Sequence, residues 1–281
     1  MPAFTRTDFE IRAAGGGPPV RGDVRVRAGL RPTAALVICH GFKGFRGANF
    51  FPNLARAAAH RGLAAVTFDF SRNGLGDDGV DFSALDRFAE QTHSRNVAEI
   101  RAVLDAVSSG TILPRTPRRI GLLGHSRGGG EALLAAADDP RVDALATWAA
   151  IGDVDSRWTA EQIATWRAGG TVQVQNTRTK QMMPVGPAYW ADWEANRARL
   201  DIPAAAARLS IPWLIVHGDA DATVNVDEAH ALFNAAGDDA ELLVVEGGDH
   251  TFGSRHPYAG ATPELRTAVD ATLEWFGTHL A

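Results

Sequence analysis

The chain has 281 residues, a formal net charge of −5 and a single cysteine. Its 45% hydrophobic and 22% charged residues are ordinary for a globular protein with a large core. The negative charge gives no basis for binding nucleic acid or an anionic membrane, and the lone Cys39 excludes an intrachain disulfide. Because no apolar run is long enough for a membrane span or a signal peptide, we expect a cytoplasmic protein.

Strands that alternate with helices are predicted over most of the chain. Residues 4–12 and 20–27 alternate apolar and polar side chains, which predicts an antiparallel hairpin with a turn over 13–19. Further strands are expected at 34–39, 63–69, 120–123, 142–148, 212–217 and 241–246. Helices are expected at 49–61, 97–107, 127–137, 227–236 and 263–280. This alternation predicts an α/β fold with a mostly parallel, doubly wound sheet and helices on both faces.

The interval 151–210 breaks the alternation, because it is rich in tryptophan and contains only one β-like stretch, at 170–175. We expect it to be a small cap inserted over the sheet edge of a single domain, 1–281. Its aromatic and methionine side chains either line an apolar substrate pocket or form the core of the cap itself. The candidates for substrate binding are Trp158, Met182, Met183, Tyr189 and Trp190.

One pentapeptide, residues 124–128, carries the strongest chemical signal. Its sequence Gly-His-Ser-Arg-Gly follows an apolar strand and precedes a helix, which is the setting of a G-x-S-x-G nucleophile elbow. The elbow holds its serine in a strained turn, and a Cβ two residues to either side would collide with the strand or helix. Gly124 and Gly128 remove those atoms, so Ser126 is the candidate nucleophile.

A serine hydroxyl needs a base, and the base needs a carboxylate that orients it. Asp221 follows the strand at 212–217, and His250 follows the strand at 241–246, in the chain order Ser…Asp…His. Both fall on the sheet edge where Ser126 is expected. Asp219 and Asp249 compete for the acid role, but Asp219 is better placed to cap its own turn, and neighbouring loop side chains such as Asp249 and His250 usually diverge.

The remaining histidines give no metal-binding pattern, so no metal is expected. His40 and His125 flank the candidate site, where we expect them to shape turns. Backbone N–H groups of Phe42 and Arg127 are the candidate oxyanion donors, because one follows the nucleophile and the other lies in the glycine-flanked loop after residue 39. For the side chains of Lys43 and Arg127 two roles stay open: attraction of anionic substrates, or solvation at the surface.

These motifs resemble those of the α/β-hydrolases, from about residue 20 to the end of the chain. The residues that carry the resemblance are His40-Gly-Phe-Lys-Gly44, Gly124-His-Ser-Arg-Gly128, Asp221 and Gly248-Asp-His250. Within that superfamily the chain is similar to small serine carboxylesterases of the feruloyl- or cinnamoyl-esterase-like and dienelactone-hydrolase-like kinds. It departs from dienelactone hydrolases proper in carrying Ser126 in place of cysteine, and from lipases in lacking a His-Gly-Gly-Gly oxyanion motif.

The resemblance implies ester hydrolysis through an acyl-serine intermediate, without a cofactor. The expected partners are a small-molecule ester and, as an open alternative, a second copy of the chain in a homodimer. Two other functions stay in competition. The same residues could serve a serine aminopeptidase or oligopeptidase-like amidase, and a hydrolase scaffold could serve a non-catalytic binding protein.

Overall fold

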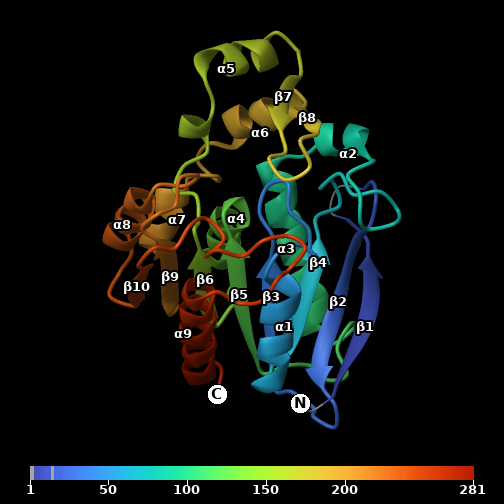
Figure 1. Cartoon of the computed structure of the whole chain (residues 1–281), viewed down its shortest axis with the longest axis vertical. Coiled ribbons are helices and arrows are strands. Elements are labelled where there is room, and N and C mark those ends of the chain that lie inside the picture. Colours follow the sequence, from blue (N-terminus) through green and yellow to red (C-terminus); the bar gives the residue numbers. More distant parts are fainter. Residues whose placement is uncertain (1–2, 14–15) are drawn as a thin grey trace.

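A computed structural model describes residues 3–13 and 16–281 (Figure 1). The predicted turn over 13–19 lies partly outside these residues. The strands of the main sheet are β1 (Phe4–Ile11), β2 (Val20–Arg27), β3 (Ala34–Cys39), β4 (Ala64–Asp69), β5 (Arg119–His125), β6 (Ala144–Trp148), β9 (Trp213–Gly218) and β10 (Ala240–Val245). The α-helices are α1 (Phe51–His60), α2 (Leu85–Ala89), α3 (His93–Ser108), α4 (Arg127–Ala136), α5 (Ala160–Arg167), α6 (Ala188–Asn196), α7 (Ile202–Arg208), α8 (Val226–Ala235) and α9 (Pro263–His279).

The main sheet has eight strands in the order β1-β2-β4-β3-β5-β6-β9-β10. β1 pairs antiparallel with β2 and β2 antiparallel with β4, whereas β4, β3, β5, β6, β9 and β10 run parallel. The predicted N-terminal hairpin is therefore confirmed, and so is the mostly parallel sheet. Because parallel strands end at one edge, the loops after β3, β5, β9 and β10 meet there.

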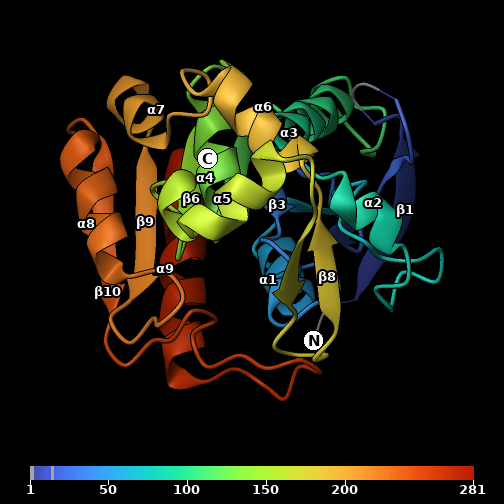
Figure 2. The same cartoon turned by 90° about the horizontal axis from the view of Figure 1, so that it is seen from above.

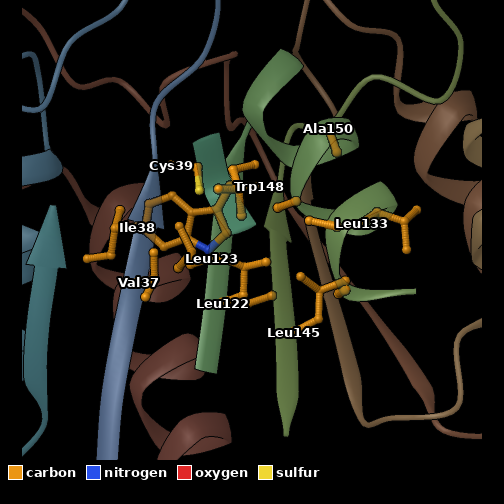
Figure 3. Close-up of a cluster of buried hydrophobic side chains, with 14 of the residues drawn as sticks. Val37, Ile38, Cys39, Leu122, Leu123, Leu133, Leu145, Trp148 and Ala150 are labelled. Carbon is orange, nitrogen blue, oxygen red and sulfur yellow. The ribbon is translucent and has the colours of Figure 1, made fainter. Parts of the chain in front are cut away.

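Helices cover both faces of the sheet, as predicted. α1 and α9 contact each other on one face, while α3, α4, α7 and α8 form a continuous layer on the other (Figures 1 and 2). The central strands are buried throughout, since every residue of β3, β6 and β9 is buried, and most of these residues are apolar. Side chains of β3, β5, β6 and α4 belong to one buried core beneath the edge, which includes Cys39, Leu123 and Leu133 (Figure 3). Burial raises the pKa of the Cys39 thiol well above its usual value, so the thiol stays protonated and unreactive.

The tryptophan-rich interval lies over the carboxyl edge of the sheet (Figure 1). It contains α5, α6 and a hairpin of β7 (Val172–Gln175) and β8 (Met182–Val185). We call residues 158–196, which contain α5, β7, β8 and α6, the cap. The sequence indicated β7 alone, because Pro184 in β8 argues against a central strand; in a two-stranded hairpin every position is on an edge. The last helix of the interval, α7, packs against α4 and α8 in the helix layer.

The start of α3 differs from the prediction for a physical reason. Helix α3 begins at His93, four residues before the first apolar position, because Thr92 caps it by accepting a hydrogen bond from the N–H of Arg95 at 3.2 Å. Its first turn buries polar side chains, including His93 and Asn96, so the apolar spacing does not mark its start. The short helix α2 follows the glycine- and aspartate-rich loop after β4 and was not predicted.

Candidate active site

Ser126 occupies a sharp turn between β5 and α4. Its φ of 57° and ψ of −126° lie outside the regions that L residues ordinarily adopt. The N–H of Ser126 donates to the carbonyl oxygen of Trp148 at 2.8 Å, which holds the turn against β6. A Cβ at Gly124 would lie 2.1 Å from the carbonyl oxygen of Gly128, and a Cβ at Gly128 2.3 Å from that of His40. Both glycines are therefore required, as the sequence pattern predicted.

Two loops bring a histidine and a carboxylate to Ser126. His250 lies in the loop between β10 and α9, and Asp221 lies in the loop after β9. His250 Nε2 is 3.0 Å from Ser126 Oγ, and His250 Nδ1 is 2.8 Å from Asp221 Oδ2. An ionised carboxylate only accepts hydrogen bonds, so Nδ1 carries the hydrogen and Nε2 is free to accept from the serine hydroxyl. The three residues form one hydrogen-bonded chain.

Asp221 is held rigidly by donors on both of its oxygens. Oδ1 accepts from the N–H groups of Thr223 at 2.8 Å and Val224 at 2.9 Å, while Oδ2 faces the ring nitrogens of His250 and His217. Burial by itself raises the pKa of Asp221, but the hydrogen bonds from His217 and His250 outweigh it and hold this pKa well below its usual range. The carboxylate therefore stays ionised and keeps the His250 ring in one orientation.

Asp219 and Asp249, the other candidates for the acid, bond to loop groups among the described residues and not to the His250 ring. Asp219 accepts from the N–H of Gly247 at 2.7 Å, and Asp249 accepts from the N–H groups of Thr251 and Gly253 at 2.9 and 2.7 Å. Both shape loops, as the sequence suggested.

His40 and His125 support the turns on either side of Ser126. His125 Nε2 lies 2.8 Å from the carbonyl oxygen of His250, so it donates to that oxygen and fixes the loop that carries the histidine. His40 Nδ1 bonds the carbonyl oxygen of Gly41 at 2.9 Å, and its Nε2 accepts from the N–H of Phe70 at 3.2 Å. Burial lowers the pKa of His40, and burial together with the nearby His250 lowers that of His125 to about 3. Both rings are neutral at physiological pH.

The loop after β3 lies directly against Ser126. A Cβ built on Gly41 would lie 3.0 Å from Ser126 Cβ, and the loop turns back through a hydrogen bond from Gly44 N–H to Gly41 O at 3.1 Å. Within the part of the chain that the structure describes, the N–H groups of Phe42 and Arg127 have no hydrogen-bond partner. Arg127 opens α4, so its N–H is one of the four that a helix leaves unpaired at its start.

The side chain of Arg127 takes neither of the two roles considered from the sequence. It is 5% exposed, and its charge is neutralised by Glu131, whose Oε1 lies 2.8 Å from Arg127 Nε. Glu131 also accepts from Asn96 and lies 2.9 Å from His93 Nδ1. Although burial alone raises the pKa of Glu131, the charge of Arg127 and the hydrogen bond from His93 lower it overall. This buried polar cluster fixes the first turn of α4.

Cap residues reach this cluster through Tyr189. The Tyr189 hydroxyl lies 2.8 Å from His93 Nε2 and accepts from Trp158 Nε1 at 3.3 Å. The guanidinium of Arg127 lies between the rings of Tyr189 and Phe42, 5.1 and 5.4 Å from their centroids. Trp158 also packs edge-on against Phe42, with centroids 6.4 Å apart. Two of the five substrate-binding candidates thus lie beside the loop next to Ser126.

The other three candidates lie in different surroundings. Trp190 stacks on Trp166, with ring centroids 5.9 Å apart and an interplanar angle of 12°. Met183 is fully buried within the cap, whereas Met182 is exposed. The structure therefore does not bring these three to the Phe42–Arg127 cluster.

Two buried residues near the site, His217 and Glu131, were not predicted from the sequence. His217 lies four residues before Asp221 and Glu131 four residues after Arg127, and this spacing was the available signal. It carries little weight alone, because a charged pair at this spacing is usually a solvated helix face.

Among the described residues no group of three or more His, Cys, Asp or Glu side chains is arranged to hold a metal ion. Within the same residues, no helix has the length and apolar character needed to cross a membrane.

Comparison with known proteins places this geometry in a family. Residues 36–261 match the model of the alpha/beta hydrolase family. The chain belongs to this family. The fold and the esterase-like resemblance expected from the sequence are confirmed, and family membership supports a hydrolase.

Individual proteins that resemble this alpha/beta hydrolase share low sequence identity with it. An uncharacterized Escherichia coli protein is 26% identical over 91% of this chain and 94% of its own length. The esterase domain of a Rhodothermus marinus protein has a similar structure, with a TM-score of 0.68, 18% identity and coverage of 99% of this chain and 100% of that one. Est1E from Butyrivibrio proteoclasticus, solved with ferulic acid bound, has a TM-score of 0.70 at 19% identity and covers 96% of this chain and 98% of its own. At these identities the structural likeness concerns the fold alone.

Proposed function

We propose that the protein is a serine hydrolase that cleaves carboxylic esters of small molecules. The observation that carries the proposal is the hydrogen-bonded chain from Asp221 through His250 to Ser126, which ends on a serine at a strained strand–helix turn. This is the arrangement that general-base activation of a hydroxyl requires.

The proposed reaction has two steps. Ser126 Oγ attacks the ester carbonyl carbon while His250 Nε2 takes the hydroxyl proton, and the resulting oxyanion accepts hydrogen bonds from the N–H groups of Phe42 and Arg127. His250 then protonates the leaving alcohol, which leaves an acyl-serine. A water molecule, deprotonated by His250, attacks the acyl carbon and releases the carboxylic acid and free Ser126. Asp221 stabilises the imidazolium in both steps.

We also propose that the cap covers the substrate within a single domain formed by the whole chain. Trp158 and Tyr189 are the cap residues placed to contact a substrate, because they surround Phe42 and Arg127. The stacking of Trp190 on Trp166 and the full burial of Met183 support a structural role for those two.

The test is initial-rate hydrolysis of p-nitrophenyl esters from acetate to palmitate and of methyl ferulate, with an aminoacyl-anilide for comparison. Ser126→Ala is expected to lower kcat by at least about 1000-fold, and adding His250→Ala is expected to change little more, because the two residues act as one unit. Circular dichroism should report an unchanged fold. Ester hydrolysis by Ser126→Ala near the wild-type rate would overturn the mechanism, and cleavage of the anilide without any ester would assign an amidase.

A further inference from the structure

A cavity of about 500 Å³ lies at the tip of the β7–β8 hairpin, and nothing in the proposed reaction uses it. We call it the hairpin groove; its lining residues are Phe45, Val80, Asp81, Phe82, Arg178, Thr179, Gln181 and His256. They come from the loop after β3, the loop after β4, the hairpin turn and the loop that follows His250. Figure 2 shows the hairpin and this last loop over the same edge of the sheet. A volume of this size accommodates a small-molecule ligand.

The groove lies at the same edge as Ser126. The N–H of Asn49 donates to His256 Nδ1 at 3.4 Å, and the next residue, Phe50, packs edge-on against the ring of His125 with centroids 5.3 Å apart. His125 immediately precedes Ser126. Phe45 follows the Gly41–Gly44 turn by one residue, so one lining residue of the groove belongs to the loop that lies against Ser126.

Arg178 is held in the groove by contacts between the face of its guanidinium plane and two aromatic rings, and not by an ion pair. Its guanidinium lies 5.4 Å from the ring centroid of Phe45 and 5.6 Å from that of Phe82. Stacking uses the face of the guanidinium plane, whereas hydrogen bonds use its edge. Across residues 3–13 and 16–281 the side chain of Arg178 makes no hydrogen bond and no ion pair, so the edge that would bind a planar anion is uncommitted.

Lys43 places a second positive charge near Arg178, whereas His256 stays neutral because its pKa is lowered. Burial and the charge of Arg178 lower the pKa of both Lys43 and His256, which places all three groups in one electrostatic neighbourhood. Lys43 Nζ donates to the carbonyl oxygen of Gln175 at 3.0 Å and forms no ion pair with the described residues. Asp81 is the one carboxylate among the described lining residues, and it is exposed and does not pair with Arg178.

We propose that the hairpin groove binds a carboxylate of the substrate, through the free edge of Arg178, so that the preferred esters carry a negative charge. This inference rests on the proposed ester hydrolysis and deepens it, because it names the substrate class. The carboxylate belongs to either the acyl or the alcohol part of the ester. Charge-assisted bidentate binding by Arg178 then selects these esters over neutral ones of the same shape.

The first test measures binding and needs no turnover. In the Ser126→Ala background, calorimetric titration compares benzoate with its neutral analogue benzamide. We expect benzoate to bind at least about tenfold more tightly, the factor contributed by one charge-assisted hydrogen bond, and Arg178→Gln to remove this preference. Arg115→Gln is the charge-matched control, because Arg115 is exposed in the loop that enters β5 at its opposite end. Absence of benzoate binding, equal affinities, or a preference that survives Arg178→Gln would overturn the proposal.

The second test locates the carboxylate by kinetics with wild-type Ser126. An acyl-side pair compares 4-nitrophenyl hydrogen adipate with its methyl ester, and an alcohol-side pair compares 4-carboxyphenyl butyrate with its methyl ester. Arg178→Gln should lower the anionic-to-neutral ratio of kcat/KM by about tenfold in one pair, mainly through KM, while Arg115→Gln leaves both ratios unchanged. Ratios that Arg178→Gln leaves unchanged in both pairs would contradict the proposal. If no ester is hydrolysed, the proposed function fails and the titration still decides whether the groove binds a carboxylate.

Discussion

His217 Nε2 lies 3.4 Å from Asp221 Oδ2, and both side chains are fully buried. The same nitrogen donates to the carbonyl oxygen of Val224 at 2.9 Å, the residue whose N–H binds the other oxygen of Asp221. His217 therefore closes the loop around the carboxylate and faces the same oxygen as His250. Asp221 is positioned by two histidines, of which only His250 reaches Ser126.

Replacing His217 should weaken catalysis without removing any reacting group. His217→Phe leaves the carbonyl oxygen of Val224 without a donor and takes one hydrogen bond from Asp221, so the Asp221 pKa should rise. We expect kcat/KM for an ester to fall by about tenfold, the factor associated with one unsatisfied buried acceptor. His217→Gln, which can still donate to that oxygen, should recover part of the rate. The measurement is kcat/KM against pH, and equal losses in Phe and Gln variants would mean that packing alone matters.

The strained turn at Ser126 allows a matched test of its glycines. A Cβ at Gly128 would lie 2.3 Å from a backbone oxygen, which cannot move without shifting the loop after β3. Gly128→Ala should therefore destabilise the protein by several kcal/mol, on the order of 3, and abolish ester hydrolysis. Chemical denaturation and initial rates measure both effects.

Gly277 in α9 is the control for this substitution. It is exposed and has no heavy atom within 4 Å of an added Cβ. Gly277→Ala should leave activity intact and raise the free energy of unfolding by up to about 1 kcal/mol, because alanine restricts the unfolded chain. A Gly128→Ala enzyme as stable as wild type would show that the turn can relax.

Acid should destabilise the folded state through the buried histidines. The pKa of His125 is lowered to about 3, whereas the unfolded residue titrates near 6.5, so between these values the unfolded chain binds a proton that the folded chain does not. The free energy of unfolding should therefore fall as pH falls from 6.5 toward 3, by up to about 1.4 kcal/mol per pH unit for this one group. The lowered pKa values of His40 and His93 act in the same direction.

The contribution of His125 is isolated by His125→Gln, whose side-chain amide can donate to the same carbonyl oxygen but does not titrate. The slope of unfolding free energy against pH between 6 and 4 should decrease in this variant relative to wild type. Denaturant titrations at a series of pH values provide the measurement. An unchanged slope would mean that His125 is protonated in the folded protein.

The helix–strand alternation and the G-x-S-x-G motif were predictable because they depend on neighbours in the chain. Apolar runs such as β3 and β5 lie inside the sheet, and Gly124 is needed because an added Cβ would clash with the carbonyl oxygen of Gly128, four residues away. Asp221 and His250 were also found from sequence, since each follows a late strand whose end must lie at the same edge. The strand β8 was not predicted because Pro184 interrupts its pattern, and the start of α3 was not predicted because its first residues are buried polar ones.

By itself, the sequence determined that the strand at 34–39 is covered on both faces, where the strained serine lies and which loops end beside it, because each follows from local periodicity and from the common direction of parallel strands. Only the tertiary structure decided that Arg127 is buried against Glu131, that His217 faces Asp221 and that Arg178 has an uncommitted edge over two phenylalanine rings. These contacts join segments through side-chain packing and charge compensation. Neither side-chain packing nor charge compensation produces a periodic pattern in the sequence. A charged residue is the same letter whether it is solvated by water or paired with a buried partner.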